Sequence, residues 1–224
     1  METNLGQRTR TTCTFGLRVP VTKACIACLR LAQTSVETNE GVAFAPDRSA
    51  IDWTTAIWLV HDAAGYSDKL DYRGHFTWIV IPGSPRTYFV QGQWTPTQLD
   101  NHSTALETAG SNMGLAAAYA NCPPGDFVEA FDSKSAAGCS IRLGCRSASM
   151  VEVTQDRAAI HTAAGTRRRL FSFFFHRELN QIADDGSKDL LGDVERRLAQ
   201  RGLPPLAKWP SPPSRLIAGG RVLN

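Results

Sequence analysis

The feature that most constrains the fold is a short, unbroken apolar run, Ala56-Ile57-Trp58-Leu59-Val60, that ends at His61-Asp62. A run of this length without polar alternation is typical of a strand that is buried on both faces of a sheet. Residues 76–81 and 87–94 predict two further strands, and the turn at residues 82–85 makes the three an antiparallel meander. The chain therefore has to fold around a covered sheet.

Further along the chain the hydrophobic period changes. Apolar residues recur at three- and four-residue steps over residues 96–119, which predicts an amphipathic helix. Residues 127–131 predict a fourth strand, which we expect to be parallel to the first because a helix connects them. An interrupted helical region (133–160), a fifth strand (170–175) and a last helix (180–201) follow. The sequence predicts an α/β fold, a mixed five-stranded sheet in the order β-β-β-α-β-α-β-α with helices on its faces.

Composition is consistent with one sizeable domain and two flanking segments. Hydrophobic residues make up 42% and charged residues 20%, which suffices for a packed core. We expect residues 1–50 to be an N-terminal extension or connecting segment, residues 51–202 to form the domain, and residues 203–224 to be a Pro-rich C-terminal tail. The formal net charge of +3 permits an anionic partner without requiring one.

Targeting signals are also informative. No stretch approaches the roughly 18 apolar residues of a membrane helix, and the N-terminus lacks the apolar centre of a signal peptide. We therefore expect an intracellular protein of the cytoplasm or nucleus, not secreted and without a membrane partner. Cys25 and Cys28 have the spacing of half a zinc site, but no second pair matches them, and buried small side chains are the favoured interpretation of the cysteines.

Four carboxylates lie at the ends of predicted strands or on predicted helices, at positions where they can converge. Asp62 closes the first strand and Asp132 the fourth, so parallel neighbours would bring both to the same edge of the sheet. Glu107, on a helix packed across that edge, can point at them, and Asp184 opens the last helix. Carboxylate oxygens are the ligands that Mg²⁺ prefers, and bound cations relieve the repulsion among such groups. Two ions about 4 Å apart can activate a water and stabilise the leaving oxygen of an in-line displacement.

Two of these residues have alternative interpretations. Thr104-Ala105-Leu106-Glu107 fits a capping box, in which Glu107 accepts from a backbone N–H, unless the helix begins earlier at Thr95-Pro96. Asp184 competes with Asp185, since either can be the first-turn acid that the helix dipole favours. His61 and His161 are interpreted as structural or exposed side chains.

The combined pattern resembles the ribonuclease H family. Asp62 in the first strand, Glu107 in the first helix and Asp132-Ser133 after the fourth strand match the order of that family. Residues 176–184, His-Arg-Glu-Leu-Asn-Gln-Ile-Ala-Asp, are similar to the Arg-Glu-x-Asn-x-x-Ala-Asp pattern of its retroelement, reverse-transcriptase-associated branch. The resemblance covers about residues 55–200. It implies that residues 51–202 form an endonuclease that hydrolyses the RNA strand of RNA–DNA hybrids with two Mg²⁺ ions, for which Mn²⁺ can substitute.

The resemblance also implies roles by position. Asp62 would bridge both ions, Glu107 and Asp132 would assist, and Asp184 would hold the ion near the attacking water. Implied substrate-binding residues are Ser133, His176 and the run Arg167, Arg168 and Arg169, for which a solvated face is the alternative. The implied partners are an RNA–DNA hybrid and a reverse transcriptase or polymerase domain.

Three departures from the family keep other functions open. The loop that follows Asp62 is longer, a basic extra helix between Asp132 and Leu170 is not evident, and the loop around His176 is short. One alternative is a binding or assembly module with a ribonuclease H fold and no activity. Another is an integrase- or resolvase-like DNA nuclease of the same superfamily. A proofreading exonuclease is disfavoured because residues 62–64, Asp-Ala-Ala, lack the Asp-x-Glu of that group.

Overall fold

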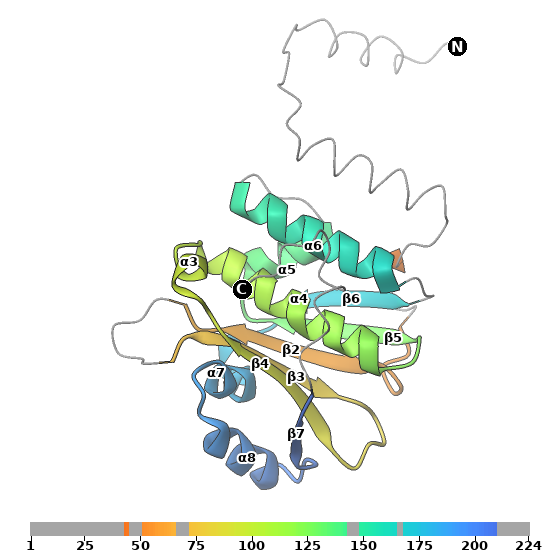
Figure 1. Ribbon diagram of the computed structural model, residues 1–224. Helices are drawn as coiled ribbons and strands as arrows, with labels where there is room; N and C mark the ends of the chain where they lie inside the picture. Colours follow the sequence, from red (N-terminus) through yellow and green to blue (C-terminus); the bar gives the residue numbers. More distant parts are fainter. Residues whose placement is uncertain (1–42, 45–50, 66–71, 143–147, 165–167, 210–224) are drawn as a thin grey trace, which may run out of the picture.

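The computed structural model describes residues 43–44, 51–65, 72–142, 148–164 and 168–209 (Figure 1). Most of the predicted extension 1–50, with Cys25 and Cys28, lies outside these residues, as do Arg167 and the tail beyond Trp209. No helix in the described part of the chain is both long and apolar enough to cross a bilayer.

A single mixed sheet forms the centre of the domain, with the strand order β1-β6-β5-β2-β3-β4-β7. Strand β2 pairs antiparallel with β3 and parallel with β5, β3 pairs antiparallel with β4, and β5 pairs parallel with β6. The predicted α/β fold with five central strands is confirmed, and short parallel strands, β1 and β7, extend it at the edges. The strands are β1 (Ala43–Phe44), β2 (Ile57–Ala63), β3 (Gly74–Val80), β4 (Thr87–Gln93), β5 (Asp126–Phe131), β6 (Arg169–Phe174) and β7 (Leu206–Lys208).

Helices cover both faces of this sheet (Figure 1). Helices α4, α5 and α6 lie on one side, and α7 and α8 lie on the other. The helices are α3 (Pro96–Leu99), α4 (Ser103–Asn121), α5 (Lys134–Arg142), α6 (Ala148–Ala164), the 3-10 turn η2 (Arg177–Leu179), α7 (Gln181–Ser187) and α8 (Leu191–Gln200). Each layer encloses a core. Leu59, Leu115 and Phe127 are fully buried beneath α4 and α6, and Phe76, Ile182 and Leu198 are buried beneath α7 and α8.

The helix predicted over residues 96–119 is in fact two helices. Helix α3 ends at Leu99, and α4 begins after His102, whose Nδ1 accepts from the backbone N–H of Thr104 at 3.1 Å. The capping box of this region joins Thr95 and Gln98 instead. The capping-box interpretation of Glu107 is therefore wrong, because Glu107 lies beyond the first turn of α4.

The helix predicted over residues 180–201 is also interrupted. Helix α7 ends at Ser187, and Asp189 adopts the left-handed conformation with φ 60°, which stops the helix before α8 begins at Leu191. The C-terminal end of the domain also differs from the prediction. Strand β7 lies within residues 203–224, which the sequence predicts to be a tail, and Thr87 N donates to Pro205 O at 3.0 Å where β7 joins the sheet beside β4.

Candidate metal centre

Three of the predicted carboxylates converge at one edge of the sheet. Asp62 lies near the end of β2 and Asp132 directly follows β5, and these strands are parallel neighbours. Glu107 reaches the same point from α4. One carboxylate oxygen from each of the three residues lies within 4.8 Å of the others, close enough for a single metal ion to contact all three. We call Asp62, Glu107 and Asp132 the carboxylate triad.

Glu107 reaches this edge because α4 lies unusually close to the sheet. A Cβ on Gly110 would lie 2.8 Å from Cβ of His75, and one on Gly114 would lie 2.1 Å from Oγ1 of Thr77. Both contacts are shorter than a side chain tolerates, so only glycine permits this approach to β3. Glu107 lies one turn before Gly110 on the same helix face, and the face that packs on the sheet therefore presents Glu107 at its edge.

The triad is electrostatically strained without a cation. Burial, together with the charges of Asp132 and Asp184, raises the pKa of Asp62 to about 7. Burial and the charges of Asp62 and Asp132 raise the pKa of Glu107 to about 9. Oε2 of Glu107 is buried without a hydrogen-bond partner among the described residues. Hard oxygen donors, a buried oxygen without a partner and unfavourable negative charge fit a divalent cation such as Mg²⁺ or Mn²⁺.

Asp184 lies beside the triad but is held by two basic side chains. Its Oδ1 accepts from Arg177 Nη2 at 3.0 Å, and its Oδ2 is ion-paired with Lys188 Nζ. Burial alone would raise the pKa of Asp184, but the bonds from Lys188 and Arg177 outweigh it and lower that pKa. The charge of Asp184 contributes to the raised pKa values of Asp62 and Glu107, so Asp184 interacts electrostatically with the triad.

Asp185 faces a different partner. Its Oδ2 accepts from Arg197 Nε of α8 at 2.5 Å, which joins the two short helices. Of the two neighbouring acids left open by the sequence, the geometry thus favours Asp184 as the one near the site.

Two residues that the sequence analysis did not assign attach α7 to the end of β2. Ser187 Oγ donates to Oδ2 of Asp62, which fixes the orientation of that carboxylate. Asn180 is fully buried, and its Nδ2 donates to the backbone carbonyl of His61 at 2.9 Å. Asn180 belongs to the Arg-Glu-x-Asn-x-x-Ala-Asp pattern, so the pattern carried this signal. Ser187 lies outside this pattern, and nothing in the sequence singled it out.

Two of the predicted substrate-binding residues lie at the same edge as the triad. Ser133 follows Asp132 and its Oγ accepts from Ala136 N at 3.2 Å, at the start of α5. His176 is exposed at the start of η2, with its ring 5.7 Å from the ring of Phe174. Ser133 is half-buried and His176 is exposed, at the ends of β5 and β6 where Asp132 emerges.

The arginines before β6 are placed elsewhere. Arg169 is paired in register with Asp126 and forms an ion pair with it at 2.6 Å, at the opposite ends of β5 and β6 from Asp132. Asp126 and Asp132 are six residues apart along the strand direction, about 20 Å. Arg168 is buried and donates to the carbonyls of Tyr119 and Cys122 at 2.9 and 3.1 Å. The structure does not bring Arg168 or Arg169 to the triad, and Arg167 lies outside the described residues.

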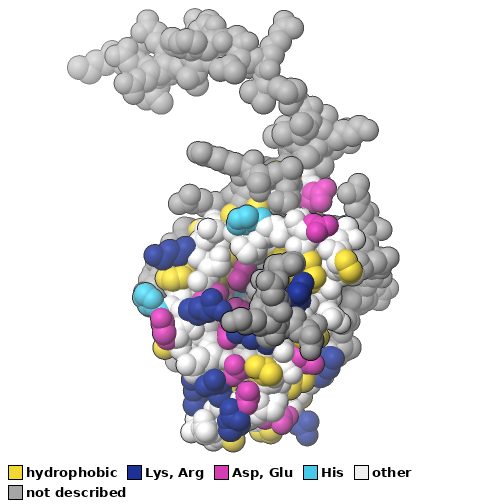
Figure 2. Space-filling view, turned by 90° about the vertical axis from the view of Figure 1, so that its left-hand side faces the viewer, with side chains coloured by type: hydrophobic (Ala, Val, Ile, Leu, Met, Phe, Trp, Pro, Cys, Tyr) yellow, Lys and Arg dark blue, Asp and Glu magenta, His cyan; other side chains and the backbone are white. Residues whose placement is uncertain are grey.

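Basic side chains nevertheless lie close to the acidic site. Figure 2 looks onto the side of the molecule from which α7 projects in Figure 1, and acidic side chains there lie next to Lys and Arg side chains. Arg177 and Lys188 contact Asp184, and Lys134, in the first turn of α5, lies with its Nζ 5.1 Å from the centre of the Phe174 ring. Lys134 and Arg177 are exposed, and Lys188 is half-buried.

Comparison with known proteins gives matches to solved structures. Ribonuclease H1 from the halophilic archaeon Halobacterium salinarum NRC-1 is 14% identical with a TM-score of 0.46, over 62% of this chain and 98% of that one. The N-terminal ribonuclease H domain of Rv2228c from Mycobacterium tuberculosis, as a fusion with maltose-binding protein, is 15% identical with a TM-score of 0.41, over 66% of this chain and 99% of that one. No family model and no curated protein matches.

The fold is ribonuclease H-like, as its own strand order, parallel β2–β5 pair and antiparallel meander establish. The two solved structures are too distant for a substrate or a mechanism to be transferred from them to this chain.

Proposed function

We propose that this chain is a metal-dependent nuclease that hydrolyses the RNA strand of RNA–DNA hybrids. The observation that carries the proposal is the convergence of Asp62, Glu107 and Asp132, each of which offers a carboxylate oxygen within 4.8 Å of the other two. The pKa values of Asp62 and Glu107 are raised at this site. A cluster of carboxylates that is partly buried is unfavourable unless cations are bound, which points to a metal centre rather than a structural ion-pair network.

The chemistry at such a centre is phosphodiester hydrolysis. A divalent ion, when bound, would polarise a phosphate oxygen of the substrate and lower the pKa of a bound water. The triad would hold the ion, and Ser187 would keep the carboxylate of Asp62 turned toward it. Lys134, exposed beside Asp132, would orient the substrate backbone through its phosphates.

The two-metal form of the mechanism adds a requirement. A second ion near Asp184 needs at least one oxygen that Arg177 and Lys188 now occupy. We propose that substrate phosphates bind the side chains of Arg177 and Lys188 in place of Asp184. The carboxylate of Asp184 would then be free to contact the second ion. Preference for RNA rests on the resemblance of residues 176–184 to the retroelement pattern, in which recognition of 2′-hydroxyls is the expected means of selection.

The test is a cleavage assay with labelled RNA–DNA hybrid, duplex RNA and duplex DNA, with Mg²⁺, Mn²⁺ or chelator. Asp132→Asn removes one member of the triad, and Asp126→Asn, on the same strand but paired with Arg169 at its other end, is the matched control. A metal ion contributes several kcal/mol to such reactions, so we expect Asp132→Asn to slow cleavage by roughly 10³-fold and Asp126→Asn to retain it.

The outcomes separate the alternatives. Metal-dependent cutting of RNA in the hybrid alone supports the proposal. Cutting of DNA instead indicates an integrase- or resolvase-like nuclease with the same carboxylates. Binding of hybrid without cutting under any metal condition contradicts nuclease activity in this chain and favours the binding module, unless cutting appears when a polymerase domain is supplied.

A further inference from the structure

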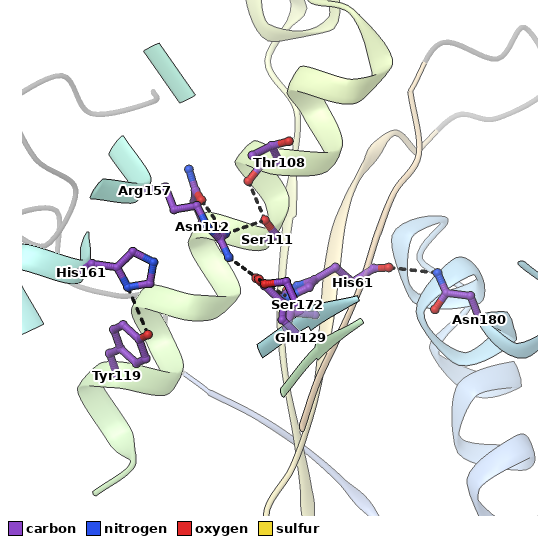
Figure 3. A network of polar contacts seen from close by, with 11 residues as sticks. His61, Thr108, Ser111, Asn112, Tyr119, Glu129, Arg157, His161, Ser172 and Asn180 are labelled. Atoms are coloured by element: carbon purple, nitrogen blue, oxygen red, sulfur yellow. Dashed lines mark hydrogen bonds and ion pairs between the residues drawn. The ribbon is translucent and has the colours of Figure 1, made fainter. Parts of the chain in front are cut away.

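A fully buried arginine, Arg157, belongs to a network of polar side chains that joins helices α4 and α6 to the sheet (Figure 3). Arg157 comes from α6, and its side chain has no exposed surface. Its Nη2 is ion-paired with Oε2 of Glu129 on β5, and its Nη1 donates to Ser111 Oγ at 3.2 Å and Asn112 Oδ1 at 3.1 Å, both on α4. One guanidinium thus contacts a strand and the helix that carries Glu107.

Glu129 extends the network to two further strands. Its Oε1 lies 3.0 Å from Nε2 of His61 on β2, and its Oε2 accepts from Ser172 Oγ on β6 at 2.8 Å. His61 is itself fixed by a 2.9 Å contact between its Nδ1 and Oγ1 of Thr77 on β3. The carboxylate of Glu129 therefore has partners on β2, β6 and α6 at once.

Each element that carries a member of the triad also carries a member of this network. His61 immediately precedes Asp62, Glu129 precedes Asp132 by three residues, and Ser111 follows Glu107 by four, one turn of helix. Asn180, which bonds the carbonyl of His61, extends the connection to α7 and Asp184.

A buried charged network of this kind is a weak source of stability, so its more informative property is the geometry that it imposes. A buried ion pair is often no more stabilising than apolar side chains of similar volume, because both charges lose their hydration. Charged hydrogen bonds, however, have strict directional requirements. A network of this kind allows few arrangements of α4, α6, β2 and β5 relative to one another.

We propose that Arg157 and Glu129 are positioning residues for the metal site, which set the spacing of the triad by fixing α4 against β2 and β5. The inference rests on the proposed function, because it concerns the same metal centre. Arg157 touches neither the triad nor a substrate, and acts through the helix and strands to which it is bonded.

The test measures metal affinity without nucleic acid, by titration of Mn²⁺ followed by electron paramagnetic resonance. The double variant Glu129→Leu/Arg157→Met replaces the pair with apolar side chains and leaves no buried charge alone. We expect it to unfold at or near the wild-type temperature but to bind Mn²⁺ about 10- to 100-fold more weakly, as when the groups that orient metal ligands are lost. Ile160→Ala, on the same helix, is the control: it removes buried apolar contacts, lowers stability and keeps Mn²⁺ affinity.

A milder pair of variants keeps the proposal testable if the double variant does not fold. Ser111→Ala and Ser172→Ala each remove one hydroxyl from the same network, but only Ser111 lies on an element that carries a triad residue. We expect Ser111→Ala to weaken Mn²⁺ binding several-fold more than Ser172→Ala does.

The outcomes separate the positioning role of Arg157 and Glu129 from the existence of the metal centre. Wild-type Mn²⁺ affinity in the folded double variant, or equal effects of the two serine variants, overturns the positioning role and leaves the proposed function intact. A wild-type protein that binds no Mn²⁺ at millimolar concentration overturns the metal centre itself.

Discussion

Two glutamates on the same side of the sheet are buried in opposite electrostatic surroundings. Burial alone would raise the pKa of Glu129, but the charge of Arg157 and the bond from His61 lower it to about 2. Burial and the charges of Asp62 and Asp132 raise the pKa of Glu107 to about 9. Glu129 is fully buried and Glu107 is half-buried, so the more buried carboxylate has the lower pKa and burial does not account for the difference.

The difference lies in which region the protein supplies with positive charge. Glu129 has a buried guanidinium of its own, whereas Lys188 and Arg177, whose charges act on Asp62 and Glu107, are both bound to Asp184. Among the described residues, Glu129 is paired with a cation, whereas no Lys or Arg forms an ion pair with a member of the triad. A site that can bind a divalent ion needs this lack, because a protein cation in the triad would compete with the ion.

The largest expected effect comes from matched glutamate-to-glutamine changes in the two regions. Glu129→Gln leaves the charge of Arg157 buried without its counter-charge, and we expect a loss of about 3–5 kcal/mol in the free energy of unfolding. Glu107→Gln removes a carboxyl that ionises unfavourably, and we expect no loss or a small gain. Urea unfolding at pH 8 with chelator measures both. Equal losses in the two variants would mean that the triad is internally compensated, contrary to the comparison.

The pH dependence of the metal-free protein should be of intermediate size. The pKa values of Asp62 and Glu107 rise from ordinary values of 3.8 and 4.5 to about 7 and about 9. The folded state therefore binds more protons than the unfolded state above pH 4.5. The stability that these groups contribute at acid pH is lost as pH rises through their folded values.

We expect a decrease of about 2 kcal/mol between pH 7 and pH 9, since each unit corresponds to about 1.4 kcal/mol for a group that is still titrating. Thermal unfolding across this range, with and without Mg²⁺, measures it. Saturating Mg²⁺ should restore most of the loss, because the ion binds the ionised triad and displaces its protons. The same experiment on Glu107→Gln should show a flatter profile, and an unchanged profile would remove Glu107 as the cause.

The comparison also shows what could be predicted from sequence. The proximity of Asp62 and Asp132 was predictable because both follow short apolar strands, and parallel neighbouring strands end at the same edge of the sheet. The fold followed from the same runs and from the helical stripe of α4. Glu129 and Arg157 are 28 residues apart on different elements, and no local pattern pairs them. An acidic residue within the apolar strand Phe127–Phe131 was the one available signal.

Helix ends were less predictable for a physical reason. The apolar residues Leu190 and Leu191 continue the helical period across the break after α7, which depends on the single left-handed residue Asp189. His102 is the N-cap of α4 and accepts a backbone hydrogen bond with its ring nitrogen, although histidine is not among the residues preferred at the N-cap. Strand β7 forms only because β4 has a free edge for it, and the prolines of that segment gave no sign of pairing.

The smallest effect concerns Lys188, which forms an ion pair with Asp184 beside the triad. Lys188→Met should change the free energy of unfolding by less than about 1 kcal/mol, since the ion pair is partly exposed. It also removes a positive charge that lowers the pKa of Asp62. A change of about 1 kcal/mol in the local potential corresponds to roughly fivefold tighter Mn²⁺ binding. Lys188→Arg keeps the charge and is the control, so wild-type affinity is expected there. Weaker binding in Lys188→Met would show that Lys188 supports the metal site instead of competing with the ion for Asp184.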